Sequence, residues 1–276
     1  MSKSFGKRRR PWEGMAALSG FLVVVVIFVL YGEKRSLENV DNDRKWNEVK
    51  IVEFMRANPQ RAYFSRLFRD GNFQVGVEVG VAGGRFAEHM ISDGRIKDYR
   101  MIEPFPLKEL EKRILNIQTN QPNGNFPLIK AKSLDKEALH AVEKEPKPDF
   151  IYLDGAHDYE NVRLELEPYY QRLALGGVLA GHDYCDYGEK PLNCKGCDPV
   201  PPCVNYTTIQ GRAKNQHGVV RAVQEWLLEQ QPQLTLYHTM ENFSPATFAR
   251  DNMNYNLILT KTRNPSWFVV KPLSSP

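Results

Sequence analysis

Carboxylate and imidazole side chains stand together at two points of this 276-residue chain, and these residue types suit acid–base chemistry or metal binding. Asp154 and His157 follow one apolar run, and His182 and Asp183 follow the next. Histidine titrates near neutrality, so His157 could act as a general base, with Asp154 as the other candidate. Asp154, His182 and Asp183 could together ligate Mg²⁺ or a similar ion. Two plainer interpretations stay open: His157 only begins a helix, and His182 and Asp183 only orient a loop.

A glycine-rich turn lies earlier in the chain, where Glu78, Gly80, Gly83 and Gly84 end another apolar run. Glycines at a strand-to-helix turn let a ligand approach the backbone, and the helix that follows offers free N–H groups. The spacing is not the G-x-G-x-x-G of dinucleotide-binding proteins, which argues against a nicotinamide-dependent oxidoreductase. A tight turn without a ligand is the plainer interpretation.

Two more polar residues follow apolar runs. Glu103 comes 23 residues after Gly80, and a carboxylate at the end of a second strand can accept hydrogen bonds from both hydroxyls of a ribose. The alternative for Glu103 is an ordinary surface residue. Ser133 follows the third run, where it is either a ligand contact or the N-cap of a helix.

Apolar strands that alternate with helices would position all of these residues. The composition, 42% hydrophobic and 25% charged, excludes wholesale disorder. We expect strands at 73–79, 99–102, 128–131, 150–153, 178–180, 234–237 and 255–260, and helices over 46–70, 107–117, 159–173 and 219–230. Pro168 should kink or split the third helix. The alternation predicts an α/β fold, a Rossmann-like, doubly wound and mostly parallel sheet whose strand ends meet at one edge.

These motifs together resemble a known family. The pattern E-x-G-x-x-x-G of Glu78, Gly80 and Gly84 resembles motif I of the class I S-adenosylmethionine-dependent methyltransferases. The run Asp-Gly-x-His-x-Tyr-Glu at 154–160 and the run Gly-His-Asp-Tyr at 181–184 are similar to methyltransferase domain family 24 and to macrocin-type sugar O-methyltransferases. The resemblance covers roughly residues 73–262.

The resemblance implies a methyltransferase that binds S-adenosylmethionine and methylates a hydroxyl of a sugar, a glycan or a related small molecule. It implies that Glu103 holds the ribose and that Ser133 lies near the adenine. It also implies that the methionine part of the donor passes the glycines Gly80, Gly83 and Gly84, and that Glu78 holds this turn in place. Asp154 is implied to contact the donor as well. The relatives carry two acids where this chain has His182 and Asp183, which leaves room for magnesium, manganese, zinc or no metal.

The N-terminal residues carry the charge asymmetry of the chain. Residues 1–14 hold five basic side chains and one acidic one, residues 15–32 hold none, and the other 32 basic and 32 acidic side chains balance. We therefore expect a cytosolic basic tail (1–14), a transmembrane signal-anchor helix (15–32) and no nucleic-acid partner. A cleaved signal peptide or a buried helix is the alternative. A stem (33–45), a helical segment (46–72), the methyltransferase domain (73–262) and a tail (263–276) follow.

This topology predicts a single-pass type II membrane protein of the Golgi or endoplasmic reticulum with a lumenal catalytic domain. The four cysteines lie within an insertion at 184–216 and suggest two disulfides or a small zinc site. We expect the insertion to form a disulfide-stapled lid, and Asn205 and Asn242 begin glycosylation triplets. A non-catalytic anchored binding protein of the same fold is the main alternative. A glycosyltransferase would suit the anchor, but the sole Asp-x-Asp triplet lies in the stem.

Overall fold

The computed structural model describes residues 45–184, 218–230, 232–241 and 265–273, which belong to one compact unit beginning at Lys45. The predicted anchor (15–32), residues 185–216 of the predicted cysteine lid, both glycosylation triplets and the predicted strand at 255–260 lie outside the described residues. Within the described part, no helix is long and apolar enough to cross a bilayer.

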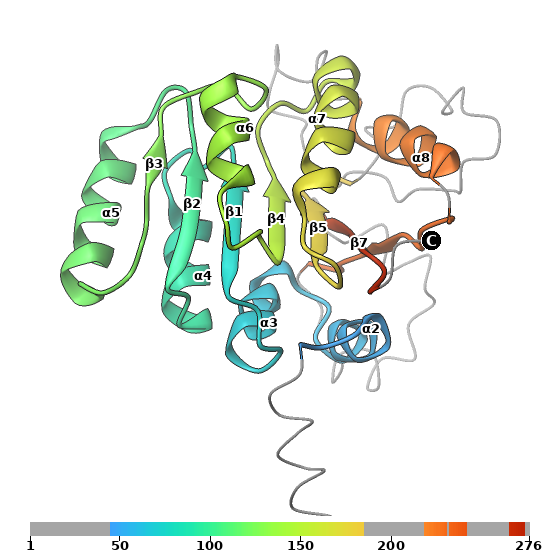
Figure 1. Cartoon of the computed structure of the whole chain (residues 1–276), viewed down its shortest axis with the longest axis horizontal. Coiled ribbons are helices and arrows are strands. Elements are labelled where there is room, and N and C mark those ends of the chain that lie inside the picture. Colours follow the sequence, from blue (N-terminus) through green and yellow to red (C-terminus); the bar gives the residue numbers. More distant parts are fainter. Residues whose placement is uncertain (1–44, 185–217, 231, 242–264, 274–276) are drawn as a thin grey trace, which may run out of the picture. The chain divides into compact units, whose positions relative to one another are not determined.

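A mostly parallel sheet forms the centre of this unit, with the strand order β3-β2-β1-β4-β5-β7-β6 (Figure 1). The first five strands run parallel, and β7 is antiparallel to both of its neighbours. The strands are β1 Val75–Val79, β2 Asp98–Ile102, β3 Leu128–Ile129, β4 Phe150–Leu153, β5 Val178–Gly181, β6 Tyr237–His238 and β7 Trp267–Val270. The predicted doubly wound, mostly parallel α/β sheet is therefore confirmed.

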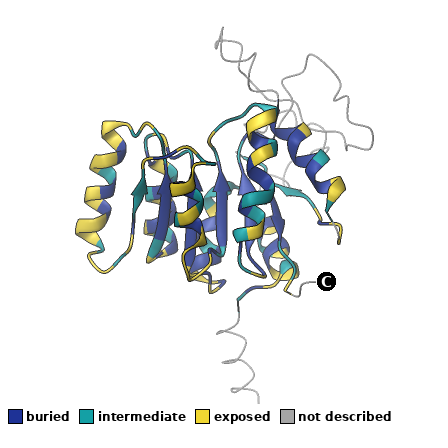
Figure 2. Cartoon of the chain, turned by 45° about the horizontal axis from the view of Figure 1, so that its top comes forward, coloured by how far each residue is buried: buried dark blue, intermediate teal, exposed yellow. Residues whose placement is uncertain are grey.

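Helices cover both faces of the sheet, which explains why the central strands are buried throughout while the outer faces of the helices are exposed (Figure 2). One apolar cluster joins the sheet to α2, η1, α3, α4 and α5, and the other joins it to α6, α7 and α8. The helices are α2 Glu48–Ala57, η1 Arg61–Phe64, α3 Ser65–Arg69, α4 Arg85–Gly94, α5 Lys108–Asn120, α6 Lys136–Glu143, α7 Tyr159–Arg172 and α8 Val219–Glu229.

Side chains of each strand alternate between these two clusters. In β4, Phe150 and Tyr152 pack into the first cluster, whereas Ile151 and Leu153 pack into the second. Each strand is thus fixed from both sides, and its carboxyl end is held in place for the polar residue that follows.

The helices differ from the expectation in two places. The predicted helix over 46–70 is divided into α2, η1 and α3, because Asn58 precedes Pro59 and leaves the helical region at φ −134°. Pro168 does not split α7, which runs unbroken to Arg172; the other expected outcome, a kink, stays a prediction. Buried Leu166 and Tyr169 on either side of Pro168 pack into the core and hold the helix against the sheet.

The C-terminal strand is the main correction to the predicted domain boundaries. Residues 263–276 were expected to be a tail, but β7 lies inside the sheet between β5 and β6. Trp267 pairs with Gly181, where a Cβ would lie 2.6 Å from the Trp267 Nε1 atom. The tryptophan ring therefore covers the end of β5, and residues 265–271 belong to the folded unit. The strand expected at 234–237 is reduced to Tyr237–His238.

Candidate functional site

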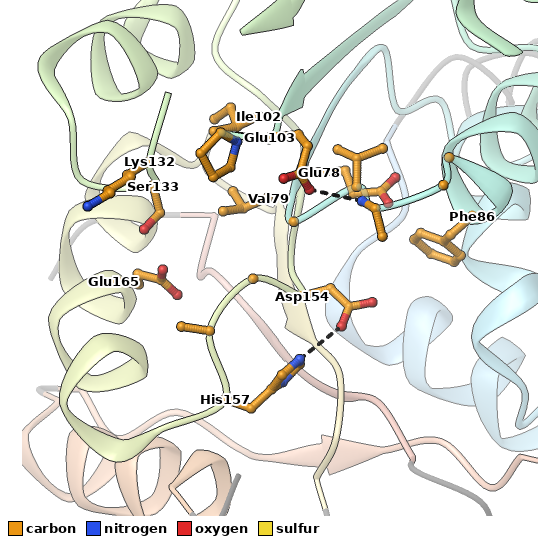
Figure 3. Close-up of a pocket in the computed structure, with 18 of the residues that line it drawn as sticks. Glu78, Val79, Phe86, Ile102, Glu103, Lys132, Ser133, Asp154, His157 and Glu165 are labelled. Atoms are coloured by element: carbon orange, nitrogen blue, oxygen red, sulfur yellow. Dashed lines mark hydrogen bonds and ion pairs between the residues drawn. The ribbon is translucent and has the colours of Figure 1, made fainter. Parts of the chain in front are cut away.

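A cavity of about 760 Å³ opens at the carboxyl ends of β1, β2 and β4 (Figure 3). Its walls come from the turns after these strands and from the turn after β3, at residues 80–86, 102–104, 132–133 and 154–157. Arg61 of η1 and Asn161 and Glu165 of α7 also line the cavity. The predicted convergence of the motifs at one edge of the sheet is thus what the structure shows.

The three glycines of the first turn have three different environments. Gly80 has φ +83°, and a Cβ there would lie 2.2 Å from the backbone oxygen of Asp154. Gly84 has φ +76° and is the N-cap of α4. Gly83 has no atom within 4 Å of the place where a Cβ would stand, although it lines the cavity. The fold therefore requires glycine at positions 80 and 84. Gly83, in contrast, leaves open space for a ligand.

Glu78 lies on the floor of the cavity and is only 1% exposed. Its Oε2 atom accepts a hydrogen bond of 2.9 Å from the hydroxyl of Tyr99. Burial raises the pKa of Glu78 well above its usual value, although the Tyr99 hydrogen bond opposes that shift. Glu78 is thus anchored to Tyr99 of β2 on the cavity floor, and its role at the turn, which the resemblance implied, stays a prediction.

Glu103 is fixed by two backbone groups. Its Oε2 atom accepts from the N–H of Ala82 and its Oε1 atom accepts from the N–H of Phe105, each at 3.0 Å. A carboxylate has about four lone-pair positions, so two remain for a ligand. The side chain is held at the cavity with acceptors to spare, as a ribose-binding residue requires.

Ser133 lies in the cavity wall and does not cap a helix. The N-cap of α6 is Asp135, so the N-cap interpretation of Ser133 is wrong. The hydroxyl of Tyr169 donates to the backbone oxygen of Ser133 over 2.7 Å, and the side chain of Ser133 hydrogen-bonds to Glu165. These contacts tie the turn after β3 to α7.

Asp154, His157, His182 and Asp183 form a cluster at the ends of β4 and β5, which are neighbours in the sheet. The Nδ1 atom of His182 lies 3.2 Å from Asp154 Oδ1 and 3.3 Å from Asp183 Oδ1. The Nδ1 atom of His157 lies 3.4 Å from Asp183 Oδ2, and its Nε2 atom lies 3.8 Å from Asp154 Oδ1 (Figure 3). The two imidazoles thus alternate with the two carboxylates.

The carboxylates favour a charged His182. Burial alone lowers the pKa of His182, but the hydrogen bond to Asp154 and the negative charges of Asp154 and Asp183 outweigh burial and raise that pKa. Asp183 has φ +55°, a left-handed conformation that aspartate adopts more readily than most residues.

The predicted metal site of Asp154, His182 and Asp183 is not supported. Among the described residues, no group of three or more His, Cys, Asp or Glu side chains is arranged to hold an ion. Imidazole nitrogens here face carboxylate oxygens at ion-pair distances, and a nitrogen that donates a proton to a carboxylate has no lone pair for a metal.

Arg61 is a cavity residue that sequence reasoning missed. Its backbone N–H donates to Glu241 Oε1 over 2.9 Å, and its guanidinium lies 5.7 Å from the centre of the Phe86 ring. Burial lowers the pKa of Arg61, but Tyr152, Asp154 and Glu241 outweigh burial and raise it, so the side chain stays charged. No motif marks Arg61, because it reaches the cavity only through the packing of η1 on the sheet.

The second missed residue is Glu165, which is 2% exposed and belongs to α7. Desolvation raises the pKa of Glu165 to about 7, a shift that the hydrogen bond from Ser133 reduces. Its sequence signal is weak, since an acid in a polar helix is ordinarily a surface residue.

The site thus combines a mostly parallel seven-stranded sheet with a glycine turn after β1 and an acid after β2. Residues 73–184 match the family model described as a methyltransferase domain. This segment is therefore similar to a methyltransferase domain, as the motifs had indicated.

Individual relatives are distant. An uncharacterized protein of Acanthamoeba polyphaga mimivirus is 27% identical over 132 residues, which are 47% of this chain and 57% of that protein. The chain thus spans little more than half the length of this curated relative. An O-methyltransferase from Bacillus cereus in complex with SAH is 16% identical, with a TM-score of 0.48, over 80% of this chain and 88% of that one. The O-methyltransferase TomG from Streptomyces achromogenes, in complex with SAM, is 12% identical, with a TM-score of 0.45, over 76% and 77%.

Proposed function

We propose that the protein is an S-adenosylmethionine-dependent O-methyltransferase. The observation that carries this proposal is a single cavity that brings two features together. The carboxylate of Glu103 lines it with lone pairs left for a ligand, and the acid–imidazole pair of Asp154 and His157 also lines it. The first feature suits a nucleoside and the second suits an acceptor that must lose a proton. The methyltransferase family match of residues 73–184 supports the same reaction.

The chain's own residues fit the donor. Glu103 has acceptors for the ribose hydroxyls, Ser133 lies in the wall where the adenine is expected, and Gly83 leaves an open face beside the N-terminus of α4. When bound, S-adenosylmethionine supplies a methyl group on a sulfonium, which an acceptor oxygen attacks in line. The work of the protein is to orient the two partners and to remove the proton of the acceptor hydroxyl.

His157 is the better general base of the two candidates. Asp154 already accepts from His182, whereas the Nδ1 atom of His157 faces Asp183 Oδ2 at 3.4 Å. If Nδ1 carries the proton and donates it to Asp183, the Nε2 atom is left as the free base. Asp183 and His182 then position His157 and Asp154 and need not touch the acceptor.

The acceptor in this proposal is a hydroxyl of a sugar, a glycan or a related small molecule. The support is the similarity of the motifs at 154–160 and 181–184 to sugar O-methyltransferases. Membrane anchoring through residues 15–32, a Golgi or endoplasmic reticulum location and a lumenal catalytic domain belong to the same proposal, on the charge pattern of the N-terminus. Assistance by a divalent ion such as Mg²⁺ stays a prediction, to be judged by the effect of a chelator on turnover.

The test is methyl transfer from isotope-labelled S-adenosylmethionine to a panel of glycosides and glycans, with the full chain as enzyme. We expect transfer that falls at least a hundredfold in His157→Gln, a loss typical of removing a general base, with donor affinity unchanged. His140→Gln serves as the matched control, because that histidine belongs to α6 and lies outside the cavity. Failure of the full chain to bind S-adenosylmethionine or S-adenosylhomocysteine would refute the proposal. Binding without transfer to any acceptor would favour the non-catalytic alternative.

A further inference from the structure

Glu165 is a buried acid whose position the reaction proposed above does not explain. It lies in the middle of α7, is 2% exposed and points its carboxyl group into the cavity from the wall opposite Glu78 (Figure 3). Its Oε1 atom lies 4.0 Å from where a Cβ of Gly155 would stand, so the open side of Gly155 faces it. Ser133, which hydrogen-bonds to Glu165, and Glu103 line the same cavity.

The surroundings of Glu165 do not hold it as an ion. No ion pair joins it to a basic group among the described residues, and no basic group is among the causes that shift its pKa. The charged and titratable groups around it are Asp158 at the start of α7, whose negative charge opposes ionisation, and Tyr169 one turn further on. Only the hydroxyl of Ser133 favours the carboxylate form.

A protonated carboxyl group at this place presents one hydrogen-bond donor and one acceptor side by side. The Watson–Crick edge of adenine presents the complementary pair, the N6 amino group as donor and N1 as acceptor. Ionised carboxylate would match the amino group but would turn a lone pair toward N1. A buried acid in its neutral form is therefore suited to this base in a way that a surface carboxylate is not.

We propose that Glu165 is the residue that recognises the adenine of the methyl donor, by pairing as a neutral acid with the N6 and N1 positions of the base. This inference rests on the proposed donor, S-adenosylmethionine, and assigns the specificity for its base to a side chain of α7. Ser133 then acts through Glu165, because its hydroxyl occupies one carboxyl oxygen and fixes the orientation of the group.

The test measures the affinity of the full chain for S-adenosylhomocysteine by calorimetry. Glutamine keeps the donor and acceptor pair but cannot ionise, so we expect Glu165→Gln to bind within about threefold of the native chain at pH 6. Glu165→Leu should bind about tenfold more weakly, which corresponds to the loss of roughly one net hydrogen bond. Because ionisation sets in near the pKa of about 7, the native affinity should fall between pH 6 and pH 8.5, and that of Glu165→Gln should stay flat.

An analogue of the ligand separates recognition from a merely structural role. In 1-deaza-S-adenosylhomocysteine a C–H group replaces N1, so the native chain should lose about tenfold in affinity and Glu165→Leu should lose little further. Equal losses in both chains would overturn the inference, as would a native affinity independent of pH. If Glu165→Leu does not fold by circular dichroism, the pH profiles of the native chain and Glu165→Gln decide alone. Absence of any binding by the native chain would instead refute the donor itself, and with it both proposals.

Discussion

Gly83 offers the sharpest test of where the ligand lies, because the chain itself gives no reason for a glycine there. A Cβ at Gly83 would meet nothing within 4 Å, and its φ lies outside the left-handed region. The change Gly83→Ala should therefore leave the free energy of unfolding unchanged or raise it by about 0.4–1 kcal/mol, since alanine restricts the unfolded chain. In the complex the same methyl group would enter space that the donor needs.

Overpacking of a well-fitted site by one methyl group costs roughly 1–3 kcal/mol, which is about a 5- to 150-fold loss of affinity for S-adenosylhomocysteine. Calorimetry gives this affinity and thermal unfolding gives the stability. Gly80→Ala is the matched control, because its Cβ would lie 2.2 Å from the Asp154 oxygen at φ +83°. That variant should lose roughly 2 kcal/mol or more and melt about 4–8 °C lower. If Gly83→Ala binds as tightly as the native chain, or melts as low as Gly80→Ala, the assignment of the ligand to this turn is wrong.

Three other predictions follow from the site and the sheet. Glu103→Ala should weaken S-adenosylhomocysteine binding about 10- to 100-fold in calorimetry, because hydrogen bonds to a charged group contribute roughly 1.5–3 kcal/mol each; an unchanged dissociation constant would exclude Glu103 as the ribose residue. Folding raises the pKa of His182, so the stabilisation that its charge provides is complete below the pKa of the unfolded chain and is lost as pH rises through the pKa of the folded chain. The difference in melting temperature between the native chain and His182→Gln should therefore shrink from pH 6 to pH 8. A difference that grows with pH would contradict the ion pair with Asp154. A chain that ends at residue 262 lacks β7 and should show no cooperative melting transition, whereas one ending at residue 273 should melt like the full chain.

The central strands and the cavity could be predicted because their signals are local. Strands buried on both faces have mostly apolar sequences, and the strands before Gly80, Glu103 and Asp154 each lead directly into a residue that suits a ligand. Parallel strands bring these ends together whatever the details of packing. Glu78, Gly80, Glu103, Asp154 and their neighbours were thus placed correctly at one cavity.

The remaining features depend on contacts between distant segments. Arg61 and Glu165 reach the cavity from helices whose sequences carry no motif, so only tertiary packing reveals them. Only four residues make up β7, and its partner β5 precedes it by more than eighty residues, which left it looking like a tail. The metal prediction was built on residue types at the ends of neighbouring strands, whereas the His182 and His157 nitrogens lie at ion-pair distances from carboxylate oxygens.

The place of β7 in the sheet also sets an order of events during synthesis. Val178 of β5 pairs with Val270, so β5 must wait for about ninety more residues before its outer edge is covered. At the usual rate of roughly 5–20 residues per second, that interval is on the order of 5–20 seconds. During it the unpaired edge of β5 offers N–H and C=O groups to any neighbouring chain. The nascent protein should therefore depend on chaperones at this edge, and slow translation of the segment between β5 and β7 should lower the yield of folded chain more than equally slow translation before β1.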